Sequence, residues 1–277
     1  MLKWAVVSKF ENRDRFKVLS DFLSDQSIEN ELEIFEPEIE SFENQLDTIK
    51  SSFDAIRIGS PYAKIIADDV ENTTSLVLSS KSVDCLVKLD GKWWPRLAIE
   101  KGYERVLSRG GADLDIHNKV LIIGTGVSAK AAINPLVGAG YTRISFTDIN
   151  EDRGQEFIDD LSKRVFNLEL EFIRQKDITL LPGTYSAVIN TTPDIESNTL
   201  IQDLTYFNYL MPAGFVLDIN IQKGETGFIK QALVVNSQVV SGIRLAAETD
   251  MFWLELVTGK PLDVVQYEER LMESFSE

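Results

Sequence analysis

Short apolar runs alternate with segments of helical periodicity along the first hundred residues of the chain. Ala5–Val7, Leu32–Phe35 and Ala55–Ile58 are mostly apolar and contain β-branched or aromatic residues, which predicts strands. Arg13–Leu23 and Phe42–Ser51 carry apolar residues three or four positions apart, the spacing of one helix face. Two further strands are predicted at Ser75–Leu78 and Val83–Val87. This alternation predicts an α/β domain with a mostly parallel sheet.

The alternation continues to the C-terminus. Ala98–Ser108 is predicted as a helix that ends at Gly110 and Gly111. Val120–Ile123 is a fully apolar strand, and it leads into a glycine turn and a helix that extends to Val137. The remaining predictions are strands at Arg143–Thr147, Leu168–Phe172, Ala187–Asn190 and Val216–Ile219, and helices at Gly154–Val165, Arg244–Leu256 and Leu262–Ser274.

Composition and charge narrow the classes of partner. The chain has 277 residues and a formal net charge of −16, and an acidic surface repels nucleic acid and anionic membranes. No apolar run is long enough to cross a bilayer. The single cysteine, Cys85, cannot form an internal disulfide, so we expect a reducing, cytoplasmic location. His117 is the only histidine, which excludes a multi-histidine metal site; we predict no metal and assign His117 no role.

The strongest chemical signal is the turn after Val120–Ile123. Gly124 permits a tight turn, Gly126 lets the backbone approach a diphosphate, and Ala129 lets the next helix pack closely on the strand. The first turn of that helix, at Val127 and Ser128, offers backbone N–H groups to phosphates. The position of the glycines between an apolar strand and a helix predicts a Rossmann-type dinucleotide site.

Asp148 follows the second strand of this domain, about 20 residues after the glycines. A carboxylate there accepts hydrogen bonds from the adenosine ribose hydroxyls and repels a 2′-phosphate, and no arginine follows directly. We therefore predict NAD as the cofactor, with NADP less favoured. The alternative is that Asp148 only caps the next helix.

Thr191 and Thr192 follow the strand at Ala187–Asn190. Small polar residues at a strand end of such a sheet line the cofactor cleft, here on the nicotinamide side. A plain loop is an equally good interpretation.

The order of these motifs resembles the shikimate/quinate dehydrogenase family. The residues that carry the resemblance are Gly124-Thr-Gly-Val-Ser-Ala-Lys-Ala131, Ile189-Asn-Thr-Thr-Pro193, Val216-Leu-Asp218, Glu225-Thr226, and Gly242 followed by Leu254-Glu-Leu-Val-Thr-Gly259. The resemblance implies an α/β substrate domain (residues 1–106 and 245–277) and a Rossmann NAD(P)-binding domain (residues 107–244), with C-terminal helices that return to the first domain. It adds Gly242 and Asn150 to the cofactor candidates. Asp148-Ile149-Asn150 stands where the NADP enzymes carry Asn-Arg-Thr, which agrees with NAD.

The substrate half departs from the family pattern. No Ser-x-Ser motif follows Val7. Ala63 stands in the place of the catalytic lysine, with Lys64 one residue later, and Ile99 replaces the catalytic Asp, with Glu100 beside it. Asp84 and Thr249 stand where the family has a substrate-binding Asn and Gln, so the resemblance makes both substrate-binding candidates.

Two alternatives remain open for the charged candidates. Lys64 and Glu100 are either a rebuilt acid/base pair or solvated charges. Arg57, at a strand end, either binds a substrate carboxylate bidentately or forms a surface ion pair.

These features favour an NAD(P)-dependent oxidoreductase that transfers a hydride between the cofactor and a small hydroxy or keto acid other than shikimate. The alternative is a non-catalytic nucleotide- or metabolite-binding module that has lost the Lys–Asp pair. A third hypothesis is a vestigial nucleotide site, because Val127 and Ser128 replace smaller family residues. We expect a monomer or homodimer whose partner is a small-molecule substrate.

Overall fold

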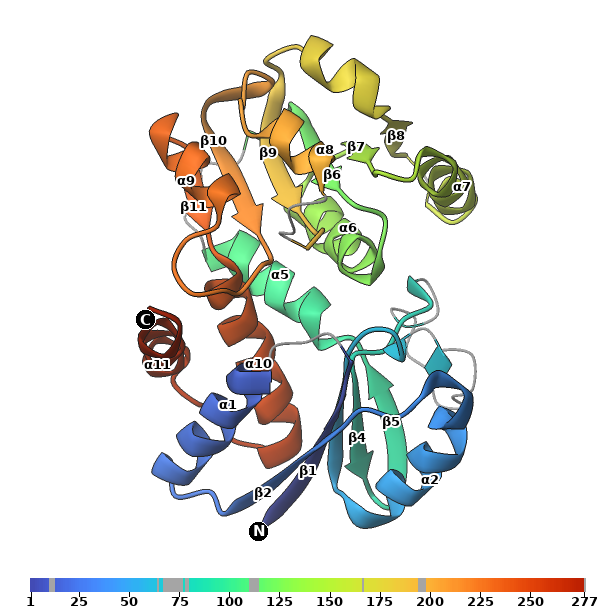
Figure 1. Cartoon of the computed structure of the whole chain (residues 1–277), viewed down its shortest axis with the longest axis vertical. Coiled ribbons are helices and arrows are strands. Elements are labelled where there is room, and N and C mark those ends of the chain that lie inside the picture. Colours follow the sequence, from blue (N-terminus) through green and yellow to red (C-terminus); the bar gives the residue numbers. More distant parts are fainter. Residues whose placement is uncertain are drawn as a thin grey trace. The chain divides into compact units, whose positions relative to one another are not determined.

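The computed structural model describes residues 1–9, 13–63, 65–66, 77, 80–109, 115–165, 167–193 and 198–276 (Figure 1). Contacts divide the chain into two compact units. The first unit comprises Met1–Lys101 and Ala247–Ser274, and the second comprises Gly102–Ala246 and Phe275–Glu277. The chain passes from one unit to the other within helices α5 (Ala98–Arg109) and α10 (Gly242–Thr258).

The first unit is built on a five-stranded sheet in the order β2-β1-β3-β4-β5. Its strands are β1 (Leu2–Val7), β2 (Asn30–Phe35), β3 (Ala55–Ile58), β4 (Cys85–Leu89) and β5 (Lys92–Arg96). β1 pairs in parallel with β2 and β3, whereas β4 is antiparallel to both β3 and β5. The sheet is therefore mixed, which corrects the prediction of a mostly parallel sheet. The antiparallel pair of β4 and β5 is a hairpin that turns at Asp90 and Gly91, whose positive φ values of 51° and 75° suit a tight turn.

Helices cover both faces of this sheet. Figure 1 shows α1 (Arg13–Asp25) and α10 on one face and α2 (Phe42–Ser52), preceded by the 3-10 turn η1 (Ile39–Ser41), on the other. Trp4 of β1 is fully buried, and its ring lies 5.1 Å from that of Trp253 on α10. Helix α11 (Val264–Phe275) adds Tyr267, whose ring packs on Phe22 of α1.

The second unit contains a six-stranded sheet in the order β11-β10-β9-β6-β7-β8, and all of its strand pairs are parallel. The strands are β6 (Lys119–Ile123), β7 (Arg143–Thr147), β8 (Glu169–Phe172), β9 (Tyr185–Asn190), β10 (Leu210–Asp218) and β11 (Gln238–Val240). The connecting helices are α6 (Val127–Ala139), α7 (Glu151–Leu161), α8 (Thr199–Leu204) and α9 (Gly227–Val234), with the 3-10 segment η2 (Gln175–Leu180). In sequence order within the unit, this is the 3-2-1-4-5-6 arrangement of the Rossmann fold. The strand order reverses between β6 and β9, where such sheets bind their ligands.

The predicted fold class, a first α/β unit followed by a Rossmann unit with C-terminal helices, is confirmed. The sequence analysis missed β5, α8, α9 and β11. The strand predicted at Ser75–Leu78 falls largely outside the described residues, and Val77, its one described member, is helical. Within the described ranges, no helix has both the length and the apolar character that crossing a bilayer requires.

Candidate functional site

The turn after β6 is a tight backbone elbow. Gly124 has a φ of +101°, and its N–H donates to the carbonyl of Thr147 at the end of β7 (2.7 Å). The backbone N–H and the hydroxyl of Thr191 both donate to the carbonyl of Ile123, at 2.9 and 2.6 Å. A Cβ atom at Gly124 would lie 2.6 Å from Thr191 Oγ1 and 2.9 Å from Thr192 Cγ2. Glycine is therefore required here both by its φ and by the close approach of the loop after β9.

Gly126 and the start of α6 remain open to a ligand. Gly126 is exposed, and no described atom other than those of its chain neighbours lies within 4 Å of the position of a Cβ. Lys130 N–H donates to the Gly126 carbonyl as the first bond of the helix (3.1 Å), so the preceding N–H groups have no acceptor within α6. Val127 and Ser128 are half-buried at this end. The elbow therefore fits a diphosphate, with the N-terminal end of the helix dipole directed at it.

Asp148, just after β7, is almost fully buried, and its carboxylate is already engaged. Oδ2 accepts a hydrogen bond from the Thr125 hydroxyl (2.6 Å), and Oδ1 accepts one from the Asn150 N–H (2.9 Å). One guanidinium nitrogen of Arg153, Nη2, donates to both oxygens, at 2.6 and 2.8 Å. The sequence analysis considered only the residues directly after Asp148 and missed Arg153, which α7 brings back over the carboxylate after one helical turn.

Asn150 caps helix α7. Its side-chain oxygen accepts a hydrogen bond from the Arg153 N–H at 2.9 Å. Asp148 is therefore not the N-cap residue itself, although it holds the cap in place through the Asn150 N–H. The structure thus gives Asn150 a definite role in helix initiation beside the predicted ribose position.

The carboxyl ends of β9 and β10 are joined by a buried polar network. The Thr192 hydroxyl donates to Asn190 Oδ1 (2.7 Å), and Asn190 Nδ2 donates to Asp218 Oδ1 (3.0 Å). Asn220 Nδ2 donates both to Asp218 Oδ1 (2.7 Å) and to the Thr192 carbonyl (2.9 Å). The Thr226 hydroxyl donates to Asp218 Oδ2, and burial nevertheless raises the pKa of Asp218. Thr192 is thus fixed by this network, which holds the two strand ends together.

Gly242 begins α10 against the same strand end. A Cβ there would lie 2.4 Å from the Asn220 carbonyl oxygen and 2.5 Å from that of Ile219. Because both are backbone atoms, a larger residue would force the helix away from β10. The structure therefore places Gly242 beside the Asp218 network.

Arg57 and Asp84 belong to a buried charge cluster in the first unit. Arg57 is 5% exposed, its Nη2 lies 3.6 Å from Asp250 Oδ1, and its guanidinium lies over the Trp253 ring. Its Nη1 atom is buried and has no hydrogen-bond partner in the described part of the chain. Burial alone would lower the pKa of Arg57, but the carboxylates of Asp84 and Asp250 raise it above its ordinary value. The alternative of a surface ion pair does not hold for Arg57.

Asp84 acts as a cap for α5. Its two carboxylate oxygens accept hydrogen bonds from the N–H groups of Ala98 (2.6 Å) and Ile99 (2.7 Å). The position that the resemblance assigned to substrate binding thus holds the start of a helix.

Of the remaining substrate-side candidates, Glu100 lies in the first turn of α5 and Thr249 lies on α10, and both are buried. Glu100, at 5% exposure, is not a solvated surface charge. Lys64 lies outside the described residues, so its geometry toward Glu100 stays a prediction.

One ion pair in the first unit escaped the sequence analysis. Arg15 on α1 donates through Nε and Nη2 to the two carboxylate oxygens of Asp250, at 2.7 and 2.5 Å. The Tyr267 hydroxyl also donates to Asp250 (3.0 Å). Arg15 and Asp250 are 235 residues apart in the sequence, so no local pattern could have predicted the pair.

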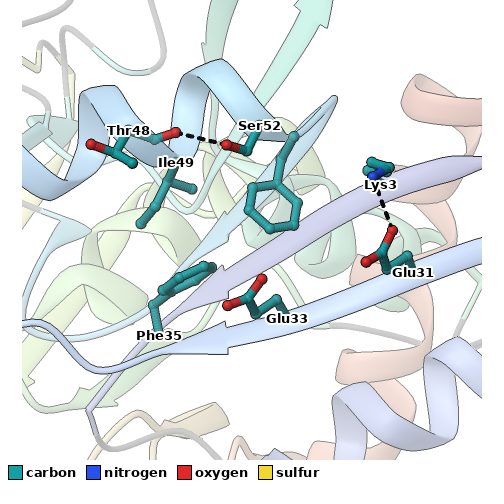
Figure 2. Close-up of a pocket in the computed structure, with 8 residues that line it drawn as sticks. Lys3, Glu31, Glu33, Phe35, Thr48, Ile49 and Ser52 are labelled. Carbon is teal, nitrogen blue, oxygen red and sulfur yellow. Dashed lines mark hydrogen bonds and ion pairs between the residues drawn. The ribbon is translucent and has the colours of Figure 1, made fainter.

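A pocket of about 310 Å³ lies between edge strand β2 and helix α2. Figure 2 shows the residues that line it. Phe35, Ile49 and Phe53 form its apolar part, and Lys3 pairs with Glu31 at its rim (3.2 Å). Among the residues that the structure describes, none of the sequence-predicted site residues lines it.

Comparison with known proteins identifies the fold. No protein-family profile matches the sequence, and no curated protein matches it at a significant level. Solved structures do match. The quinate dehydrogenase from Corynebacterium glutamicum in complex with NAD superposes with a TM-score of 0.84 at 18% identity, covering 98% of this chain and 99% of that chain.

Two further structures extend the comparison. The shikimate 5-dehydrogenase from Thermus thermophilus in complex with NADP(H) and shikimate has a TM-score of 0.81 at 16% identity and covers 99% of this chain and 100% of that one. The ligand-free 5-ketofructose reductase of a Gluconobacter strain has a TM-score of 0.80 at 15% identity and covers 99% of each chain. Over almost its whole length, this chain has the fold of the shikimate and quinate dehydrogenases.

Proposed function

We propose that the chain is an oxidoreductase that binds a nicotinamide dinucleotide in its second unit. The observation that carries the proposal is the open elbow at Gly126, combined with a buried carboxylate, Asp148, at the end of the neighbouring strand. The elbow leaves room and N–H groups for a diphosphate, and the carboxylate lies where an adenosine ribose is bound in such sheets. No described atom beyond the chain neighbours of Gly126 lies within 4 Å of the position of its Cβ, which argues against a vestigial site.

NAD is the proposed cofactor in preference to NADP. Asp148 carries a negative charge next to the expected position of the ribose, where a 2′-phosphate is repelled. The structural relatives do not decide this point, because one of them is a complex with NAD and another a complex with NADP(H).

The proposed substrate is a small hydroxy or keto acid other than shikimate. Arg57 supports an acid as the substrate. Its buried Nη1 has no hydrogen-bond partner among the described residues, and a carboxylate oxygen could supply one. When bound, the nicotinamide would accept or donate the hydride. The chain's own part is to hold the acid and to move the hydroxyl proton, for which Lys64 with Glu100 is the proposed acid/base pair.

The second candidate is a non-catalytic binding module. It is favoured by Ala63 and Ile99, which occupy the positions where the related enzymes carry their catalytic Lys and Asp and which cannot transfer a proton. This candidate keeps the dinucleotide site and loses turnover. We also propose a reducing, cytoplasmic environment, in keeping with the buried single thiol of Cys85.

A two-stage experiment tests these proposals. First, NADH and NADPH fluorescence titrations measure binding to the purified chain; binding of neither would overturn the proposal. Second, a panel of hydroxy and keto acids is screened for NAD(P)-linked turnover by the chain, by Lys64→Ala and by Lys17→Ala, a control at an exposed lysine on α1. Turnover that is lost only in Lys64→Ala supports the enzyme, whereas tight NADH binding without turnover of any acid supports the module.

A further inference from the structure

The Asp148 carboxylate has no free acceptor position for a ligand. Its two oxygens receive four hydrogen bonds, from the Thr125 hydroxyl, from the Asn150 N–H, and twice from Arg153. A carboxylate offers about four lone-pair sites. Ribose hydroxyls can therefore reach Asp148 only if one of these donors leaves.

The donors differ in how easily they leave. Thr125 is buried within the elbow, and the Asn150 N–H belongs to the backbone at the start of α7. The Arg153 side chain is 60% exposed, whereas that of Asp148 is 1% exposed. Arg153 therefore covers Asp148 from the solvent side and can swing away by changing its own rotamers.

We propose that Arg153 is a specificity-determining residue that competes with the ribose for Asp148. This proposal rests on the proposed dinucleotide site. In the free protein Arg153 covers Asp148, and the adenosine ribose of NAD(H) binds by displacing the guanidinium. The affinity for NAD(H) is therefore reduced by the ion pair that must be broken.

The same guanidinium has the opposite effect on NADP(H). While Arg153 is paired with Asp148, the two charges cancel, and a 2′-phosphate meets a cation as well as an anion. Arg153 can stay in place and donate to the phosphate. The Arg153 side chain thus weakens binding of the ribose hydroxyl and strengthens binding of the phosphate. It therefore reduces the ratio of NAD(H) affinity to NADP(H) affinity that Asp148 alone would give.

The test is to measure dissociation constants for NADH and NADPH by fluorescence titration with the full chain and with Arg153→Met. An exposed ion pair contributes up to about 1 kcal/mol, so we expect Arg153→Met to bind NADH about fivefold more tightly. NADPH should bind about tenfold more weakly, because a charge-assisted hydrogen bond to the phosphate is lost. In Arg153→Lys, both dissociation constants should be close to those of the unaltered chain.

A matched control is Arg164→Met, which removes an arginine paired with Asp160 just beyond the opposite end of α7. It changes the net charge equally and should leave both constants within about twofold of those of the unaltered chain. If Arg153→Met weakens NADH binding or leaves it unchanged while the unaltered chain binds NADH, the competition is refuted and the dinucleotide site stands. If the unaltered chain binds neither nucleotide, the proposed function fails and this inference fails with it.

Discussion

The two glycines of the elbow should respond to alanine in opposite ways. Gly124 has a φ of +101°, which costs an alanine about 1–2 kcal/mol. Its new Cβ would also lie 2.6 Å from Thr191 Oγ1, which cannot yield without losing its hydrogen bond to Ile123, and 2.9 Å from Thr192 Cγ2. Overpacking of this kind costs about 1–3 kcal/mol. Gly124→Ala should therefore lose about 3 kcal/mol of unfolding free energy.

Gly126→Ala should leave stability almost unchanged. The backbone at Gly126 has φ −79° and ψ −165°, which any residue adopts, and its Cβ would meet no atom of the described residues within 4 Å, chain neighbours apart. We expect a loss below about 0.5 kcal/mol. The added methyl group occupies the space where a diphosphate must approach, so the NADH dissociation constant should rise about tenfold or more.

Thermal unfolding and NADH titration of the two variants provide the test. For a chain of this length, about 3 kcal/mol corresponds to a fall in Tm of about 5 °C for Gly124→Ala. Adding Thr191→Ala to that variant should recover part of the loss, because Oγ1 is removed while Ile123 keeps the Thr191 N–H as a partner. Equal losses of Tm at the two glycines, or unaltered NADH binding by Gly126→Ala, would refute the assignment of the elbow.

Three further predictions concern buried polar groups. Burial raises the pKa of Asp218 above its ordinary value of 3.8. The protonated carboxyl therefore contributes to stability below pH 3.8, and this contribution is lost as the pH rises through the folded-state pKa. The unfolding free energy measured in urea should fall between about pH 4 and 7, and it should fall less for Asp218→Asn. Arg15→Met leaves the buried Asp250 without its bidentate partner and should cost about 3 kcal/mol in the same assay, whereas Arg13→Met, at an exposed ion pair, should cost less than about 1 kcal/mol; similar losses would refute the distinction. Burial raises the pKa of the Cys85 thiol, so a disulfide reagent should modify Cys85 only in denaturant, and rapid labelling of the folded chain would contradict this.

The sequence predicted the elements whose periodicity or apolar run is long enough to detect. β3 and β7 have the predicted bounds, and α1 and α2 begin at the predicted residues. β5 was missed because Pro95 argues against a strand; the structure accommodates it because β5 lies at the sheet edge, where a missing N–H is tolerated. The six residues of α8 and the three of β11 are too short to show a period.

The candidate site was predictable where the backbone dictates the residue. The φ of Gly124 and the contact at Gly242 admit only glycine, so these positions can be recognised in the sequence. The arginine partners of the buried carboxylates cannot be recognised in this way. Arg153 reaches Asp148 because a helical turn intervenes, and Arg15 reaches Asp250 only after the two ends of the chain meet.

The first unit draws its residues from both ends of the chain, which sets an order for its assembly during synthesis. Trp4 leaves the ribosome more than two hundred residues before Trp253, which packs on it. Until then the face of the sheet shared by α1 and α10 lacks the α10 part of its cover, and Arg15 and Arg57 lack the carboxylate of Asp250. The second unit lies almost wholly within one continuous stretch and can form its sheet in the meantime. The nascent N-terminal segment therefore waits with part of its apolar surface uncovered, and such transiently exposed surface is prone to aggregation.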